Sequence, residues 1–138
     1  MEHRLDSNQS TCFEVIASQP YSNNYLKVKP GELYEFEVDA RDTWTDWFIK
    51  TNANGFCNFF LRDKDKRVPG HKCFKLCGTI GKNEADHFPI GTNKLWQSTS
   101  DDEIYFFAND SKKLNKKKTF KFYQNNKGSI SLTIRRHQ

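Results

Sequence analysis

The sequence predicts an all-β protein, a jelly-roll-like β-sandwich, and three observations lead to this prediction. Short apolar or alternating segments recur along the chain of 138 residues, with turn-forming residues between them. No segment has the amphipathic period of a helix with recognisable end caps. Apolar residues make up only 36% of the chain, but 12 Phe, 5 Tyr and 3 Trp are among them, and these large rings can fill a core. Short strands joined by turns are typical of a sandwich.

The first half of the chain contains five segments that are apolar, aromatic or alternating. They are residues 12–17, 25–28, 33–40, 43–49 and 55–61. Between the second and the third, Lys29-Pro30-Gly31-Glu32 places Pro and Gly for a turn. In the third segment Tyr34, Phe36 and Val38 alternate with polar residues, which predicts one buried face.

The second half continues the strand pattern after a charged stretch at residues 62–67, which we expect to be a solvated loop closed by Pro69-Gly70. Strands are predicted at residues 73–80, 104–108 and 130–134, and the last of these alternates cleanly. There is no internal repeat and no linker composition. We therefore expect one sandwich domain over residues 10–138, after a flexible N-terminal segment at residues 1–9.

Positive charge is concentrated at the C-terminal end of the chain. The net charge is +5, yet residues 111–138 hold nine basic side chains and no acidic one, while residues 1–110 carry 13 basic and 17 acidic side chains. A charge run is typical of a solvated loop, and it also attracts acidic partners. A nucleic-acid partner is not expected, because no recognisable binding module is present.

The sequence offers no segment for membrane insertion. No apolar run approaches the 18 residues that a membrane span needs, and the first six residues do not resemble a signal peptide. We expect a soluble protein, for which a secreted or extracellular location is compatible with the composition.

Four cysteines, an even number, are compatible with two disulfides in an oxidising compartment. They are Cys12, Cys57, Cys73 and Cys77. On one strand Cys73 and Cys77 would lie about 13 Å apart, too far for a direct bond. A bridge from Cys57 to either one and four free thiols both remain open. Zinc with His71 or His87 is not favoured because the spacing is wrong, and free cysteines packed as small apolar residues are the preferred interpretation.

Two parts of the chain contain motifs more specific than a strand pattern. The first is Leu76-Cys77-Gly78-Thr79-Ile80-Gly81-Lys82-Asn83, followed by Phe88-Pro89-Ile90-Gly91 and Trp96. In the second, Asn109-Asp110 ends an apolar run and Tyr123-Gln124-Asn125-Asn126-Lys127-Gly128-Ser129 precedes the last strand. Together they resemble the calcium-dependent galactose-binding lectins of the PA-I type and their galactose-binding-like β-sandwich relatives, over most of residues 14–136.

This resemblance implies a Ca²⁺ site at which a glycan binds. Asp110, Asn125 and Asn126 would be side-chain ligands, and the carbonyl of Phe122 would be another. A further backbone ligand falls at Trp44, counted from Pro30-Gly31. Carboxylate, amide and carbonyl oxygens are the donors that Ca²⁺ prefers. Asp110 would also accept a sugar hydroxyl.

Aromatic side chains near this site are candidates for stacking on a sugar. We expect at most one of Trp44 and Trp47 to reach a ligand, with Trp47 as the candidate contact, and we place Trp96 in the core. Since a single sugar site is usually weak, a lectin of this kind would gain avidity as a homo-oligomer.

Two stretches depart from the family pattern. Residues 111–122 form an insertion with six lysines, and residues 61–66 are charged where the family has its His-Pro-x-Gln sugar contact. The alternative function is therefore a non-catalytic interaction domain that kept the sandwich and lost the ion. It would bind a protein or an acidic partner through Lys112–Lys121.

We expect no enzymatic activity, because the acidic residues cluster in turn-like stretches without a catalytic motif.

Overall fold

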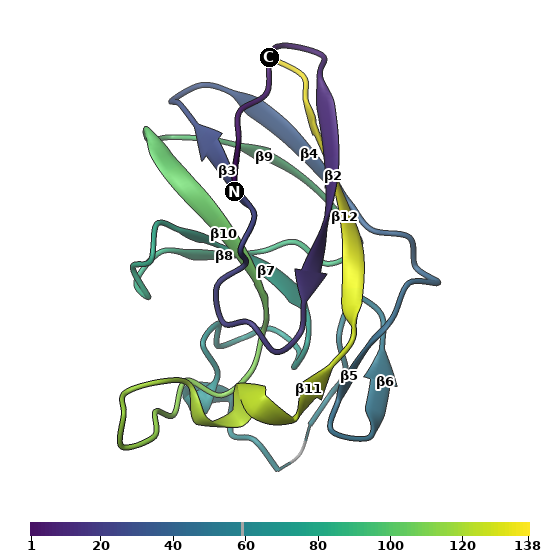
Figure 1. Cartoon of the computed structure of the whole chain (residues 1–138), viewed down its shortest axis with the longest axis vertical. Coiled ribbons are helices and arrows are strands. Elements are labelled where there is room, and N and C mark those ends of the chain that lie inside the picture. Colours follow the sequence, from purple (N-terminus) through teal and green to yellow (C-terminus); the bar gives the residue numbers. More distant parts are fainter. Residues whose placement is uncertain (59) are drawn as a thin grey trace.

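The computed structural model describes residues 1–58 and 60–138 and contains two main β-sheets (Figure 1). The five-stranded sheet has the order β1 (Glu2–His3), β3 (Tyr25–Val28), β10 (Asp102–Ala108), β7 (Leu76–Ile80) and β8 (His87–Pro89). The four-stranded sheet has the order β2 (Ser10–Ile16), β12 (Ser129–Arg136), β4 (Leu33–Glu37) and β9 (Asn93–Gln97). This arrangement confirms the predicted all-β sandwich.

A small third sheet lies at the end of the sandwich away from the C-terminus (Figure 1). Its order is β11 (Asn126–Lys127), β5 (Trp44–Asp46) and β6 (Ile49–Thr51). Helical structure in the described residues is limited to two 3₁₀ turns, η1 (Asp63–Asp65) and η2 (Lys121–Asn125). No helix in this part of the chain has the length and apolar character needed to cross a membrane.

The core lies between the two main sheets, as the alternating segments predicted. Ile130, Leu132 and Ile134 of β12 have at most 1% of their surface exposed, and the intervening residues point to the other face. Phe36 of β4 meets Phe106 of the opposite sheet with ring centroids 5.6 Å apart. The predicted buried face of β4 is confirmed, and contacts between rings join the sheets.

Other segments differ from the sequence prediction. Residues 43–49 form a hairpin, β5 and β6, instead of a continuous stretch, because the chain turns at Trp47 with a positive φ of 56°. Residues 55–61 contribute a single bridge from Phe56 to Cys73, and residue 59 of that segment lies outside the described residues. β7 begins at Leu76 instead of residue 73, because Phe74 has a φ of 62°.

The first residues, for which we expected a flexible segment, make several contacts with the sandwich. β1 pairs in parallel with β3, and Leu5 is 3% exposed within the core. The guanidinium of Arg4 donates to both carboxylate oxygens of Glu32, at 2.8 and 2.5 Å. These contacts are made with partners distant in the sequence. A single leucine among charged residues gives no pattern from which they could be predicted.

Strand β7, which pairs with β10 and β8, requires a residue without a side chain at Gly78, and this gives a testable prediction. A Cβ added there would lie 2.5 Å from Cζ of Phe88, whose ring is stacked on Trp96 at 4.6 Å. We expect Gly78→Ala to lower the free energy of unfolding by about 2 kcal/mol, because overpacking a filled core is costly. Urea denaturation measures this change.

The matched control is the double variant Gly78→Ala/Phe88→Leu, in which the smaller side chain makes room for the new methyl group. The two substitutions should be non-additive, since the residues are directly opposite each other in the sheet. Additive losses of stability would contradict the proposed clash.

Candidate functional site

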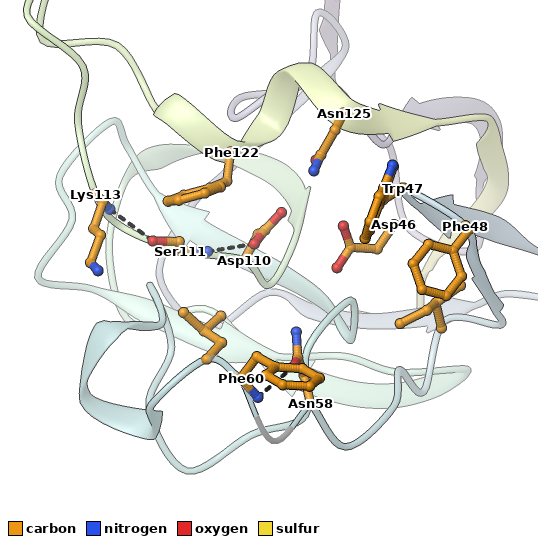
Figure 2. A pocket seen from close by; sticks show the side chains of 12 residues that line it. Asp46, Trp47, Phe48, Asn58, Phe60, Asp110, Ser111, Lys113, Phe122 and Asn125 are labelled. Carbon is orange, nitrogen blue, oxygen red and sulfur yellow. Dashed lines mark hydrogen bonds between the residues drawn. The ribbon is translucent and has the colours of Figure 1, made fainter.

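A pocket of about 360 Å³ opens beside the small sheet, between the β5–β6 hairpin, the end of β10 and η2 (Figure 2). Its lining combines acidic side chains, amides and aromatic rings. The following residues from distant parts of the chain meet there: Asp46, Trp47, Phe48, Asn58, Phe60, Asp110, Phe122 and Asn125. This is the place in the described structure where groups able to bind a polar ligand converge with exposed apolar surface.

Two carboxylates lie side by side in this pocket (Figure 2). Asp110 directly follows β10 and is 6% exposed, and Asp46 is the last residue of β5. Burial raises the pKa of Asp110 to about 7, and the negative charge of Asp46 adds to this rise. Burial also raises the pKa of Asp46. A buried acid and a partly buried acid that both disfavour ionisation would be stabilised by a cation between them.

Amide side chains complete the polar part of the pocket. Asn126 Nδ2 donates to the carbonyl of Ala17 at 3.0 Å and to Asp110 Oδ2 at 3.2 Å. Its Oδ1 is buried and has no hydrogen-bond partner among the described residues. The side chain of Asn125 points toward the two carboxylates (Figure 2). A buried acceptor without a partner is unusual in a folded protein, and a cation would satisfy it.

Strand pairing explains why these residues meet. β11 is antiparallel to β5, which places Asn126 opposite Asp46. The backbone N–H of Trp47 donates to the carbonyl of Asn125 at 3.1 Å and closes the same junction. Gly128 follows with a φ of 80°, a conformation that glycine adopts without strain. The adjacent amides of the Asn-Asn turn can therefore face one site.

The structure brings together most of the residues that the sequence indicated. Asp110, Phe122, Asn125 and Trp47 line the pocket, and Asn126 contacts Asp110 from behind. Trp44 is not among the lining residues, and its side chain is 1% exposed with its Nε1 donating to the carbonyl of Phe74 at 3.1 Å. Trp47 is therefore the ring that reaches the pocket, while the backbone ligand expected at Trp44 stays a prediction. Trp96 is partly buried against the core, as expected.

Sequence reasoning missed Asp46 and the rings of Phe48 and Phe60. Asp46 is the one acidic residue of the aromatic segment 43–49, and that was the available signal. Counting along the family pattern selected Trp44 instead. The pairing that brings Asp46 to Asp110 joins positions far apart in the chain and leaves no local pattern.

The segment 62–67 was predicted to be solvated, and this is wrong for Arg67, whose side chain is fully buried. Its guanidinium donates to both carboxylate oxygens of Glu84, at 2.9 and 2.8 Å, and to the carbonyl of Pro20 at 2.7 Å. It also lies 3.6 Å from the ring centroid of Phe107. Five donors and a flat face allow an arginine to be buried where a lysine would lack partners.

Arg67 also connects two elements that border the pocket, the end of β10 and η2. Its backbone N–H donates to the carbonyl of Asp110 at 2.9 Å, and its guanidinium donates to the Tyr123 hydroxyl at 3.0 Å. That hydroxyl donates in turn to the carbonyl of Ala108. The end of β10 and the η2 turn are thus held together by the buried residues Arg67 and Tyr123.

The cysteines and histidines do not form a metal site. All four cysteines are free, and burial raises the pKa of Cys73 to about 11 and that of Cys77 to about 12. No three His, Cys, Asp or Glu side chains gather in the part of the chain that the structure describes. The pocket instead offers two carboxylates and two amides, an oxygen donor set of the kind that Ca²⁺ prefers.

Comparison with solved structures identifies a similar fold. The N-terminal domain of EclA, described as a PllA-like lectin, superimposes with a TM-score of 0.60 over 91% of this chain and 94% of that chain, at 19% sequence identity. At this identity the likeness establishes the fold alone. No protein-family model and no curated protein matches the sequence. The chain therefore has the β-sandwich fold of a lectin domain.

Proposed function

We propose that this protein binds carbohydrate at the pocket beside the small sheet, with the help of a bound Ca²⁺. The observation that carries the proposal is the cluster of polar side chains around Asp110 in this pocket. Among the described residues, Asp110 and Asp46 form no ion pair with a basic side chain, and the neighbouring Asn126 Oδ1 has no hydrogen-bond partner. The lectin-type fold is a second, independent support.

In this proposal the chain provides an oxygen shell. The side chains of Asp46, Asp110, Asn125 and Asn126 and the carbonyl of Phe122 would hold the ion. Once bound, Ca²⁺ supplies coordination positions that sugar hydroxyls can occupy in place of water. Asp110 would accept a hydrogen bond from a sugar hydroxyl. Galactose-type glycans are the first ligands to test.

Charge balance at the pocket favours a cation in spite of the nearby lysines. The six lysines of residues 112–121 are exposed, and exposed charges are screened over about 8 Å at physiological salt. Asp110 is buried and Asp46 is partly buried, so their attraction for an ion inside the pocket is screened less.

We expect Ca²⁺ to raise the thermal stability of the protein. At about 100 times its dissociation constant, a ligand stabilises the native state by about 2.7 kcal/mol, which corresponds to several degrees in Tm. Differential scanning calorimetry in CaCl₂ and in EDTA measures this shift, with Mg²⁺ as the control for charge alone. A glycan screen in the same two buffers should show binding in CaCl₂ only.

An unchanged Tm would contradict the ion site and favour the alternative interaction domain. The observation behind that alternative is the exposure of all six lysines between residues 112 and 121. Binding to an acidic partner through them would fall steeply with salt and would be indifferent to EDTA.

A further inference from the structure

Exposed apolar side chains are concentrated at the mouth of the pocket. Among the described residues, eight large apolar side chains are exposed, and four of them line this one pocket. They are Trp47, Phe48, Phe60 and Phe122, with 63, 70, 100 and 38% of their surface exposed. Single exposed apolar residues need no explanation, but a group of rings at one place marks an interaction surface.

The ring pair on the hairpin is held in its exposed position by the backbone. Trp47 has a φ of 56°, which is uncommon for a bulky residue, and its N–H is fixed by the carbonyl of Asn125. The Trp47 and Phe48 rings then meet edge to face, with centroids 4.5 Å apart. The exposure is thus fixed by the local backbone, and strained backbone is often associated with function.

The lysine-rich loop lies at the same end of the molecule as these rings. In Figure 1 the loop of residues 111–121 and the β5–β6 hairpin both extend from the end opposite the C-terminus. Lys113 lines the pocket together with Phe122, and Lys121 Nζ lies 5.5 Å from the centroid of the Phe122 ring. Leu114, 51% exposed, adds an apolar side chain to the loop itself.

The positive charge of this end is not neutralised by neighbouring acids. Asp63 and Asp65 of η1, which adjoins the loop through the bond from Lys112 N–H to the Asp65 carbonyl, already pair with Lys66 and Arg62. None of the six lysines of residues 112–121 forms an ion pair within the described chain. The end of the sandwich therefore combines a cluster of exposed rings with a block of free positive charge.

We infer that this end of the sandwich docks onto an anionic lipid bilayer. Aromatic rings favour the level of the lipid headgroups, where one side is apolar and the other is wet. Clustered lysines are attracted to the negative surface of such a membrane. A soluble polyanion would use the lysines and leave the rings in water, whereas a bilayer uses both. The inference does not depend on the ion site and goes beyond the proposed sugar binding.

The test is a vesicle sedimentation assay with the whole protein in EDTA, so that the ion site takes no part. The probes are vesicles of phosphatidylcholine alone and with about 30% phosphatidylserine, and the anionic vesicles should bind at least about 10-fold more tightly. About 0.5 M NaCl should remove most of this difference. The emission of Trp47 should shift to the blue on binding, since Trp44 and Trp96 are buried or partly buried.

Two variants separate the contributions of charge and rings. The triple variant K116Q/K117Q/K118Q and the double variant F48S/F60S should each weaken binding by about 10-fold. The matched control for charge is K29Q/K82Q/R135Q, which removes three exposed charges outside the loop. The control for apolar surface is L95S, at an exposed position of β9. Both controls should bind like the unaltered protein.

Equal binding to neutral and anionic vesicles would overturn the inference, and so would no binding to either at about 1 mM lipid. Capture by immobilised heparin without vesicle binding would also overturn it, because the lysines alone would then explain the partner. None of these results bears on Ca²⁺ stabilisation or glycan binding, so a failure here is separate from a failure of the proposed function.

Discussion

Replacement of Asp110 by Asn is expected to abolish stabilisation by Ca²⁺ and, in EDTA, to make the protein more stable than the unaltered chain at neutral pH. The folded-state pKa of Asp110 is raised to about 7 by burial and by Asp46, far above the ordinary value of about 3.9 in an unfolded chain. The folded protein therefore binds this proton more tightly. The stability that the proton provides is complete below about pH 4 and is lost as the pH rises through about 7.

Without metal, the ionised Asp110 costs up to about 4 kcal/mol at pH 8, since one pKa unit corresponds to about 1.36 kcal/mol. Asp110→Asn removes this cost together with its pH dependence. Urea denaturation in EDTA between about pH 5 and pH 8 measures the effect, which should grow across that range. The control is Asp86→Asn, which removes an exposed acid. Parallel pH profiles of Asp110→Asn and the unaltered protein would contradict the assignment.

The second large effect is expected at Arg67. Arg67→Met should lower the free energy of unfolding by about 3 kcal/mol, because it removes the charged partner of Glu84 and the donor to the Pro20 carbonyl and the Tyr123 hydroxyl. Methionine keeps much of the side-chain volume, so a cavity contributes little to this loss. The corresponding fall in Tm is about 10 °C for a chain of this size.

Loss of Arg67 should also weaken Ca²⁺ binding, because it removes one of the two hydrogen bonds of the Tyr123 hydroxyl, the group that links η2 to the end of β10. The matched control is Arg4→Met, which breaks an ion pair with Glu32. That variant should lose stability and keep its affinity for Ca²⁺. Isothermal titration with CaCl₂, well below either Tm, distinguishes the two. If both variants bound Ca²⁺ equally, Arg67 would have a structural role only.

The strands that were predicted correctly are those with a strong alternating pattern. In β12 each buried aliphatic residue is flanked by polar ones. In β4 the buried Tyr34 and Phe36 alternate with Glu35 and Glu37. β8 and β9 were missed, because they are short and β9 reads Asn-Lys-Leu-Trp-Gln with its leucine exposed. Such strands form because a neighbouring strand supplies hydrogen bonds, and their own side chains carry little of the alternating pattern that predicts a strand.

The candidate site was predictable only in part, for a similar reason. Asp110, Asn125 and Asn126 belong to motifs that can be read along the chain. The structure places Asp110 and Asn125 in the lining of one pocket and Asn126 against Asp110. Arg67 stood in a charged stretch, where composition favours solvent exposure. Its burial depends on Glu84, Tyr123 and Phe107, which come from three separate segments.

The sequence alone determined which faces of the strands are buried and which strand ends carry oxygen donors, because both are properties of neighbouring residues. The tertiary structure decided that Asp46 stands beside Asp110, and that Trp44 enters the core while Trp47 stays exposed. These outcomes follow from the pairing of β11 with β5 and the left-handed turn at Trp47. Pairing over 80 positions depends on the packing of the whole sandwich, and local periodicity does not encode it.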